Sequence, residues 1–247
     1  MAIANTQSKK EIAYQGIRQM ILSGKYTPSD TLPERQLCQE LGVSRTPVRE
    51  ALQALVNDGM LEIIEGKGVV VRKVNLRDLI EIFELRLALE SLAVYLFVER
   101  ATADTVAQLR RIFDTAEQAL IDDDHPTFME YDMKFHHYIA QESKNVRLKQ
   151  TIVSNYDQIQ LMAVSVRDDP ELCRIASQNH QAIMEAVERR DKEAATQHMS
   201  EHIKQIKLYH QTTIICLNDP LTTSLQPAKG KAAVSIDTAA LPIWRKL

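Results

Sequence analysis

The glycines of this 247-residue chain are distributed very unevenly. Six of the seven lie within the first 68 residues, and the next one is Gly230. Glycine adopts the left-handed backbone conformation that ends helices and closes tight turns, and a low glycine content as a whole favours an α-rich protein. The clustering therefore predicts two different architectures, a glycine-punctuated segment and a glycine-free helical one, which meet near residue 74.

The bulk composition is that of a globular protein. Hydrophobic residues make up 45% of the chain and charged residues 26%, which is enough for real cores and argues against a disordered chain. We find no apolar segment long enough for a signal peptide or a membrane span. The three cysteines, Cys38, Cys173 and Cys216, are widely spaced and predict neither a disulfide framework nor a CxxC zinc site. We therefore expect a cytoplasmic protein without membrane contacts.

The first 74 residues predict three short helices followed by a β-hairpin. Apolar spacing and bounding glycines or prolines place the helices at 12–22, 33–41 and 44–57. Two β-branched runs around a glycine-containing tip predict the hairpin at 61–71. This order of elements is typical of a winged helix-turn-helix, in which the third helix enters the major groove of DNA by its N-terminus.

Cationic residues fall where such a module would contact DNA. Arg45 and Arg49 are four residues apart on one face of the third helix, and guanidinium groups bind guanine edges or phosphates with two hydrogen bonds. The remaining candidate contacts are Arg35, Ser44 and Thr46, with Gly66 and Lys67 at the hairpin tip. Arg49 has an alternative role, because it could pair with a nearby acidic residue instead of reaching DNA.

Three sequence motifs of this module resemble the winged helix of the GntR family of bacterial regulators. They are LPERQL at 32–37, GVSRTPVREAL at 42–52 and LVNDGML at 55–61, within a resemblance that covers residues 9–73. The resemblance implies a dimer on a short palindromic operator. It also implies that Arg35, Arg45, Thr46 and Arg49 lie at phosphates or bases and Gly66 near the groove.

The remainder of the chain predicts an all-helical domain over residues 75–217. Apolar periodicity and capping residues such as Asn75 place six helices at about 75–100, 103–121, 126–142, 146–166, 170–190 and 192–216. Short connections favour antiparallel neighbours in a bundle. The final segment, 218–247, holds three of the eight prolines and lacks strong periodicity, so we expect an extended or disordered tail.

Several residues of this domain could hold a metal ion. Asp132 and His136 are four residues apart on one predicted helix, and His180 and His202 lie on later helices. Spacing alone leaves two alternatives open: these histidines could be ordinary surface residues, or His198 and His202 could form a rival pair.

Residues 76–216 resemble the FCD ligand-binding domain of the FadR subgroup within the same family. The matching phrases include Leu85-Arg86 with Leu89-Glu90, Asp132 to His136 with Asn145, Ser177 with His180 and Ile183, and Met199 with His202-Ile203. The four positions that bind metal in the metal-containing branch are Asp132, His136, His180 and His202 here. The resemblance implies a divalent metal, zinc foremost, with nickel or another transition metal as alternatives.

The resemblance also places Arg86 toward a cavity, where it could pair with the carboxylate of an effector. The alternative is a salt bridge to Glu90, one helical turn later. A metal ion beside a guanidinium suits a small organic acid. We therefore expect a homodimeric, ligand-responsive regulator that represses transcription by default and is not an enzyme. An acyl-chain sensor without metal and a metal-dependent hydrolase are the alternative functions.

Overall fold

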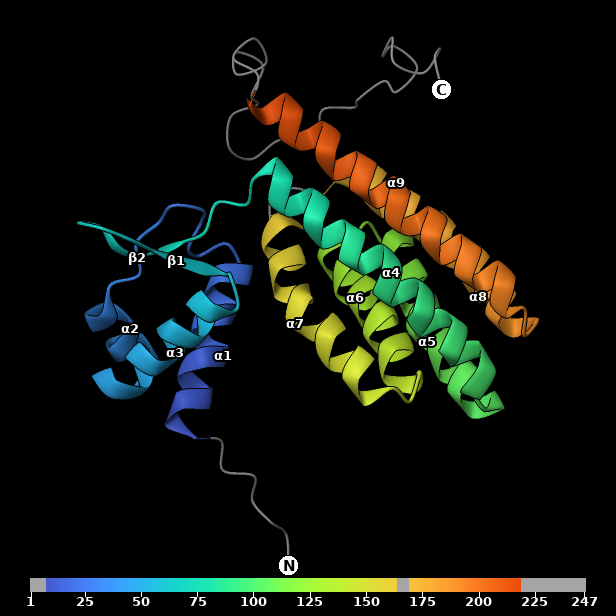
Figure 1. Ribbon diagram of the computed structural model, residues 1–247, viewed down its shortest axis with the longest axis horizontal. Helices are drawn as coiled ribbons and strands as arrows, with labels where there is room; N and C mark the ends of the chain where they lie inside the picture. The colour runs from blue at the N-terminus through green and yellow to red at the C-terminus, as the bar shows by residue number, and fades with distance from the viewer. Residues whose placement is uncertain (1–7, 164–168, 219–247) are drawn as a thin grey trace, which may run out of the picture.

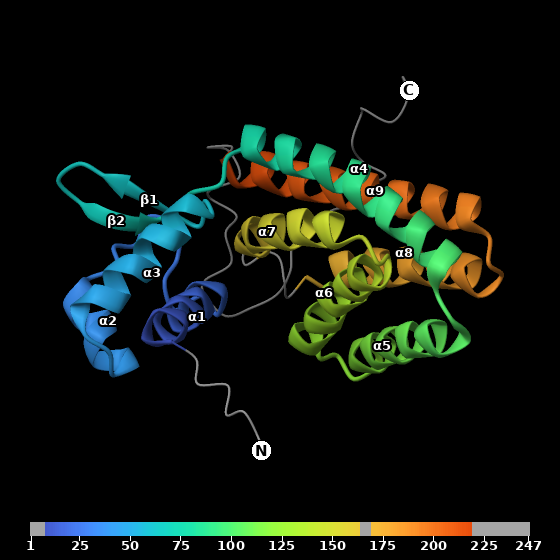
Figure 2. The ribbon, with the colours of Figure 1, turned by 60° about the horizontal axis from the view of Figure 1, so that its bottom comes forward.

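The computed structural model describes residues 8–163 and 169–218, which are mainly helical and form two hydrophobic cores. Figures 1 and 2 show a small N-terminal unit of helices and a hairpin beside a larger helical bundle. This confirms the predicted fold class. The expected tail lies outside the described residues apart from its first residue, which ends the last helix.

Three helices build the N-terminal unit: α1 (Lys9–Leu22), α2 (Glu34–Leu41) and α3 (Arg45–Asn57). The side chain of Ser8 caps α1 by accepting a hydrogen bond from the Glu11 amide at 3.1 Å. Gly42 ends α2 with a φ of 65°, the left-handed conformation that the turn between α2 and α3 requires. The buried face of α3 consists of Pro47, Val48, Ala51, Leu52 and Leu55, of which the last four belong to the core of this unit.

A two-stranded antiparallel hairpin completes this unit. Strand β1 (Leu61–Ile64) pairs with β2 (Gly68–Val71), in a register that sets Leu61 opposite Val71. Gly66 and Gly68 have φ values of 77° and 85°, so glycine makes this turn possible without strain. The hairpin projects from the helices as a wing (Figure 2).

Over the described residues the bundle consists of six helices, as the sequence predicts: α4 (Leu76–Arg100), α5 (Ala103–Ile121), α6 (His125–Glu142), α7 (Val146–Ala163), α8 (Pro170–Glu188) and α9 (Lys192–Asn218). Asn75 and Asp78 form a complete capping box that fixes the start of α4. Asp169 caps α8 through the Glu171 amide, with Pro170 in the first turn. The two longest helices, α4 and α9, pack along each other (Figure 1).

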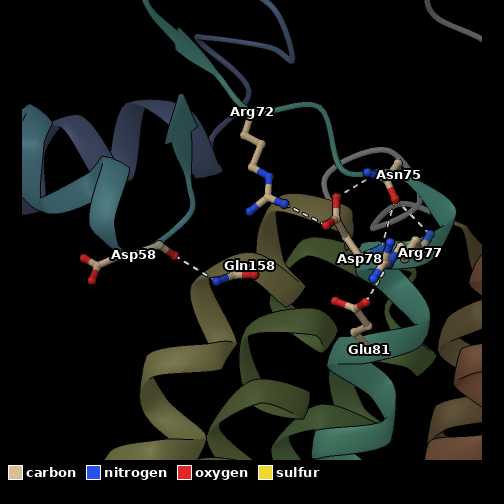
Figure 3. Close-up of polar contacts among 7 residues, drawn as sticks. All are labelled: Asp58, Arg72, Asn75, Arg77, Asp78, Glu81 and Gln158. Carbon is tan, nitrogen blue, oxygen red and sulfur yellow. Dashed lines mark hydrogen bonds and ion pairs between the residues drawn. The ribbon is translucent and has the colours of Figure 1, made fainter. Parts of the chain in front are cut away.

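Helix α7 lies between the two units (Figure 2). The buried side chain of Leu161 belongs to the core of the N-terminal unit, although its helix is part of the bundle. Gln158 Nε2 donates a hydrogen bond of 3.0 Å to the carbonyl of Asp58, the residue that caps the C-terminus of α3 (Figure 3). Arg18 donates another of 3.0 Å to Gln160. The bundle therefore contacts the end of the third helix directly.

The connection between the units is also held by an ion pair. Arg72 at the end of the hairpin donates to Asp78 Oδ1 in the first turn of α4 at 2.7 Å (Figure 3). Val74, between them, packs against both cores. These contacts fix the path of the chain from the wing into the bundle.

No helix in the described ranges, 8–163 and 169–218, combines the length and apolarity that a membrane crossing requires.

Candidate nucleic-acid interface and metal centre

The outer face of α3 presents the polar residues that the sequence predicts at DNA. Ser44 occupies the N-cap position, but its hydroxyl makes no capping hydrogen bond and remains exposed. Arg45, Thr46 and Arg49 follow on the exposed face, while Pro47 and the rest of the inner face are buried. The amphipathic helix thus fixes the direction in which its cations point.

The other predicted DNA contacts are also on the surface. Arg35 is exposed in the first turn of α2, and Gly66 and Lys67 are exposed at the tip of the hairpin. Arg49 Nε donates to both carboxylate oxygens of Glu34 at 2.9 Å, which is the acidic pairing that the sequence left as an alternative. The pair is accessible, with 65% of the Arg49 side chain and 37% of the Glu34 side chain exposed.

Three of the four predicted metal ligands meet inside the bundle. His136 on α6, His180 on α8 and His202 on α9 are each no more than 3% exposed. One ring nitrogen from each lies within 4.8 Å of the others. His136 Nε2 and His180 Nε2 are 3.1 Å apart. Their convergence excludes the alternative of scattered surface histidines.

The fourth predicted ligand, Asp132, lies at the edge of this cluster. Its Oδ1 is 3.7 Å from His180 Nε2, and its side chain is 14% exposed. Burial raises the pKa of the Asp132 carboxyl, whereas the positive charge of Arg86 opposes that shift. The rival residue His198 points elsewhere: its side chain is 35% exposed and lies 3.5 Å from Glu201.

Two imidazoles of the cluster, those of His180 and His202, favour the neutral form. Burial lowers the pKa values of His180 and His202 well below the ordinary value, and neighbouring charges add to the effect. A neutral imidazole carries one proton and one lone pair, and the lone pair is what binds a metal ion. The ring nitrogens of His180 and His202 are therefore suited to bind a metal ion.

The donor set fits a transition-metal ion. Two nitrogen ligands on tetrahedral zinc lie about 3.3 Å apart, close to the distance between His136 Nε2 and His180 Nε2. The buried Nδ1 of His202 has no hydrogen-bond partner among the described residues. A buried polar atom of this kind needs a ligand or water to offset its desolvation. Three imidazoles with a nearby carboxylate suit zinc or nickel better than calcium or magnesium.

Arg86 on α4 is buried and makes the salt bridge that the sequence offers as the alternative to effector binding. Its Nε donates to Glu90 Oε1 at 2.7 Å. The guanidinium lies 5.1 Å from the centre of the Phe83 ring and 5.7 Å from that of Tyr156. Because this hydrogen bond uses Nε, the salt bridge is compatible with a second contact through the terminal nitrogens of Arg86.

A cavity of about 40 Å³ adjoins the histidine cluster. Arg86, Asp132 and His202 line it together with His210, and the rest of the wall is apolar: Met129, Met133, Ile159, Leu172, Ala176 and Ile206. A cavity of this size can hold a few non-hydrogen atoms, such as those of water molecules or of a carboxylate group. A cationic side chain, a carboxylate and an imidazole from the predicted metal cluster therefore face one small space.

Sequence reasoning missed two polar residues of this region. Glu90 was considered only as a partner of Arg86, yet its second oxygen lies 2.6 Å from His136 Nδ1. His210 is 6% exposed and lies two helical turns beyond His202 on α9, next to Phe83. Its spacing from His202 could have signalled a shared side of the helix, but such pairs are common among seven histidines.

Two family models match the chain, one for each unit. The model described as bacterial regulatory proteins, gntR family, matches residues 9–71. The model described as FCD domain matches residues 81–205, which include the histidine cluster and Arg86 but end before His210.

Similar proteins cover both units together. An uncharacterized HTH-type transcriptional regulator, YdhC of Bacillus subtilis, is 30% identical over 76% of this chain and 85% of its own length. The HTH-type transcriptional repressor NanR of Cronobacter sakazakii is 27% identical over 79% and 83%. The solved structure of E. coli McbR/YncC matches with a TM-score of 0.75 and 25% identity, covering 84% of this chain and 99% of that one.

Proposed function

Because the chain belongs to the GntR family of bacterial transcriptional regulators and carries an FCD domain, we propose that it is a ligand-responsive regulator with two functional parts. Residues 9–74 bind operator DNA, and residues 75–217 bind a divalent metal and a small organic acid. The observation that carries the proposal is the convergence of three buried imidazoles beside Arg86, in a bundle that contacts the end of the candidate recognition helix.

The exposed cations of the winged helix support DNA recognition. Arg45 and Arg49 project from the first turns of α3 toward base edges or phosphates, with Ser44 and Thr46 beside them. Arg35 and Lys67 bind the flanking phosphates, and Gly66 lets the wing backbone approach the groove. The exposed ion pair between Arg49 and Glu34 contributes little stability, so DNA can replace the carboxylate at small cost.

A homodimer on a palindromic operator follows from the size of this reading surface. One recognition helix covers only a half-site, and two helices one turn apart read a symmetric sequence. We propose repression as the default mode, which a relative named as a repressor supports. The regulator acts in the cytoplasm, where its DNA target lies.

Zinc is the metal that the donor set supports first, with nickel as the alternative. His136, His180 and His202 hold it, and Asp132 completes the set. When bound, the ion supplies a positive centre for a carboxylate or hydroxyl group. The terminal nitrogens of Arg86 bind a second negative group of the same acid, because they belong to a side chain that lines the same cavity.

The alternative functions have weaker support. An acyl-chain sensor needs an elongated apolar channel, whereas the cavity beside Arg86 measures about 40 Å³. A hydrolase would share the histidine cluster, but the matching families and relatives are transcription regulators and not enzymes.

Selection from random DNA, followed by a mobility-shift assay, tests this function. We expect the zinc-loaded protein to select a palindrome and to bind it as two chains. Arg45→Ala should weaken binding at least tenfold, whereas Arg77→Ala, which removes another exposed arginine, on α4, should leave it unchanged. A panel of small organic acids should contain one that changes operator affinity only when zinc is present. Selection of no sequence, or an equal effect of both variants, would contradict the proposal.

A further inference from the structure

Glu90 joins two groups that the proposed function treats separately. It lies on α4 one turn after Arg86 and is 3% exposed. Its Oε1 accepts a hydrogen bond from Arg86 Nε at 2.7 Å, and its Oε2 lies 2.6 Å from His136 Nδ1. One buried carboxylate therefore contacts both the proposed anion-binding residue and a proposed metal ligand.

This contact decides which nitrogen of His136 carries the proton. An ionised carboxylate is only an acceptor, so the 2.6 Å approach of Glu90 Oε2 favours a proton on His136 Nδ1 over one on Nε2. With one proton on the ring, at Nδ1, the lone pair is on Nε2, the atom that faces His180. In the opposite tautomer, a proton on Nε2 could bond to His180 Nε2 and would occupy the position that a metal ion needs.

The other oxygen of this carboxylate faces a cation. Arg86 Nε donates to Glu90 Oε1 in a salt bridge whose two side chains are only 7% and 4% exposed. Glu90 in turn fixes the guanidinium through Nε.

We propose that Glu90 is a positioning residue, which holds His136 with Nε2 toward the metal and anchors Arg86 at the wall of the same cavity. The inference rests on the proposed metal site and adds a residue outside its ligand set. It also connects the two halves of the effector site, because any movement of Arg86 toward an acid acts on the carboxylate that orients His136.

Zinc affinity tests this role when it is measured by competition with a chromogenic chelator. We expect Glu90→Gln to weaken zinc binding by about ten- to a hundredfold, the usual effect of losing such a carboxylate. Glu84→Gln is the matched control on the same helix, because that side chain is 64% exposed and pairs with Lys207. Its zinc affinity should equal that of the wild type.

The proton on His136 gives a second readout that needs no metal. In chelator-treated wild-type protein, long-range proton–nitrogen NMR spectra should show His136 protonated at Nδ1 and bare at Nε2. In Glu90→Gln this preference should weaken or reverse. If that variant does not fold, the wild-type spectrum decides: a proton on Nε2 would overturn the inference.

The outcomes separate this inference from the proposed function. Zinc binding by the wild type with equal binding by Glu90→Gln would overturn the role of Glu90 and leave the metal site standing. Absence of zinc binding in the wild type would overturn both.

Discussion

A buried histidine, His210, makes the stability of the bundle depend on pH. Burial lowers its pKa to about 4, and the charge of Arg86 adds to the shift. In the unfolded chain the pKa returns to its ordinary value of 6.5. The unfolded state therefore binds the proton more readily as the pH falls through this window, so the stability that is present above pH 6.5 is lost progressively toward pH 4.

We expect His210→Phe to reduce this pH dependence. Between pH 7.5 and pH 5, His210 should account for a loss of about 2 kcal/mol of unfolding free energy in the wild type, which the variant avoids. Urea denaturation with a chelator present measures the difference. Arg86, Asp132 and His202 face the same cavity and are present in both proteins. Their contributions to the pH dependence therefore cancel when the two profiles are subtracted. Identical pH profiles would contradict the assignment.

The ion pair between Arg49 and Glu34 leads to a second prediction about a single residue. Glu34→Gln removes a negative charge from the reading surface and releases Arg49 for DNA, so operator affinity should rise several-fold at low salt. Glu81→Gln, which releases Arg77 in a similar exposed pair on α4, is the control and should have no effect. Fluorescence anisotropy over a salt series measures both. A fall in affinity for Glu34→Gln would show that Arg49 needs its acidic partner at the DNA.

Individual residues were predictable where a local rule fixes them. Gly42, Gly66 and the capping pair Asn75 and Asp78 follow from backbone conformation and hydrogen bonding within a few residues. The histidine cluster was predictable only through family resemblance, because its members come from three helices. Glu90 has no local signal for its second role, since His136 lies 46 residues further along the chain.

Among the elements, α7 makes contacts that link the two units. Its inner side carries Ile159 at the cavity, and its other side places Leu161 in the core of the winged helix. The sequence predicts α7 as one more helix of the bundle. It does not predict this docking, because an apolar residue near a helix end has the same pattern whichever core it enters.

Leu161→Ala tests the contribution of this contact. Leu161 is 4% exposed, and truncation of a buried leucine costs about 2–5 kcal/mol. We expect faster amide exchange in α1 and α3, which pack in the core that Leu161 enters. Val153→Ala lies on the same helix with 44% exposure and should change little. Equal exchange in the two variants would contradict a structural role for the docking.

In the whole molecule, shared contacts connect the two cores. Val74 packs against both, and Gln158 bonds to the end of α3. A ligand that binds only the folded bundle stabilises it by mass action, by about 2.7 kcal/mol at a hundred times its dissociation constant. Through α7 this stabilisation should reach the winged helix. We therefore expect zinc to raise the temperature of a single calorimetric unfolding transition in the wild type. In Leu161→Ala this transition should split into two, and the unfolding temperature of the winged helix should no longer rise with zinc.

The central claim is that the bundle holds a metal ion on His136, His180 and His202. Calorimetric titration of zinc into chelator-treated protein tests it most directly, with two variants measured alongside. We predict one zinc per chain in the wild type, loss of this binding in His180→Ala, and wild-type binding in His198→Ala, whose histidine lies outside the cluster. Undiminished zinc binding in His180→Ala, or no binding in the wild type, would contradict the account.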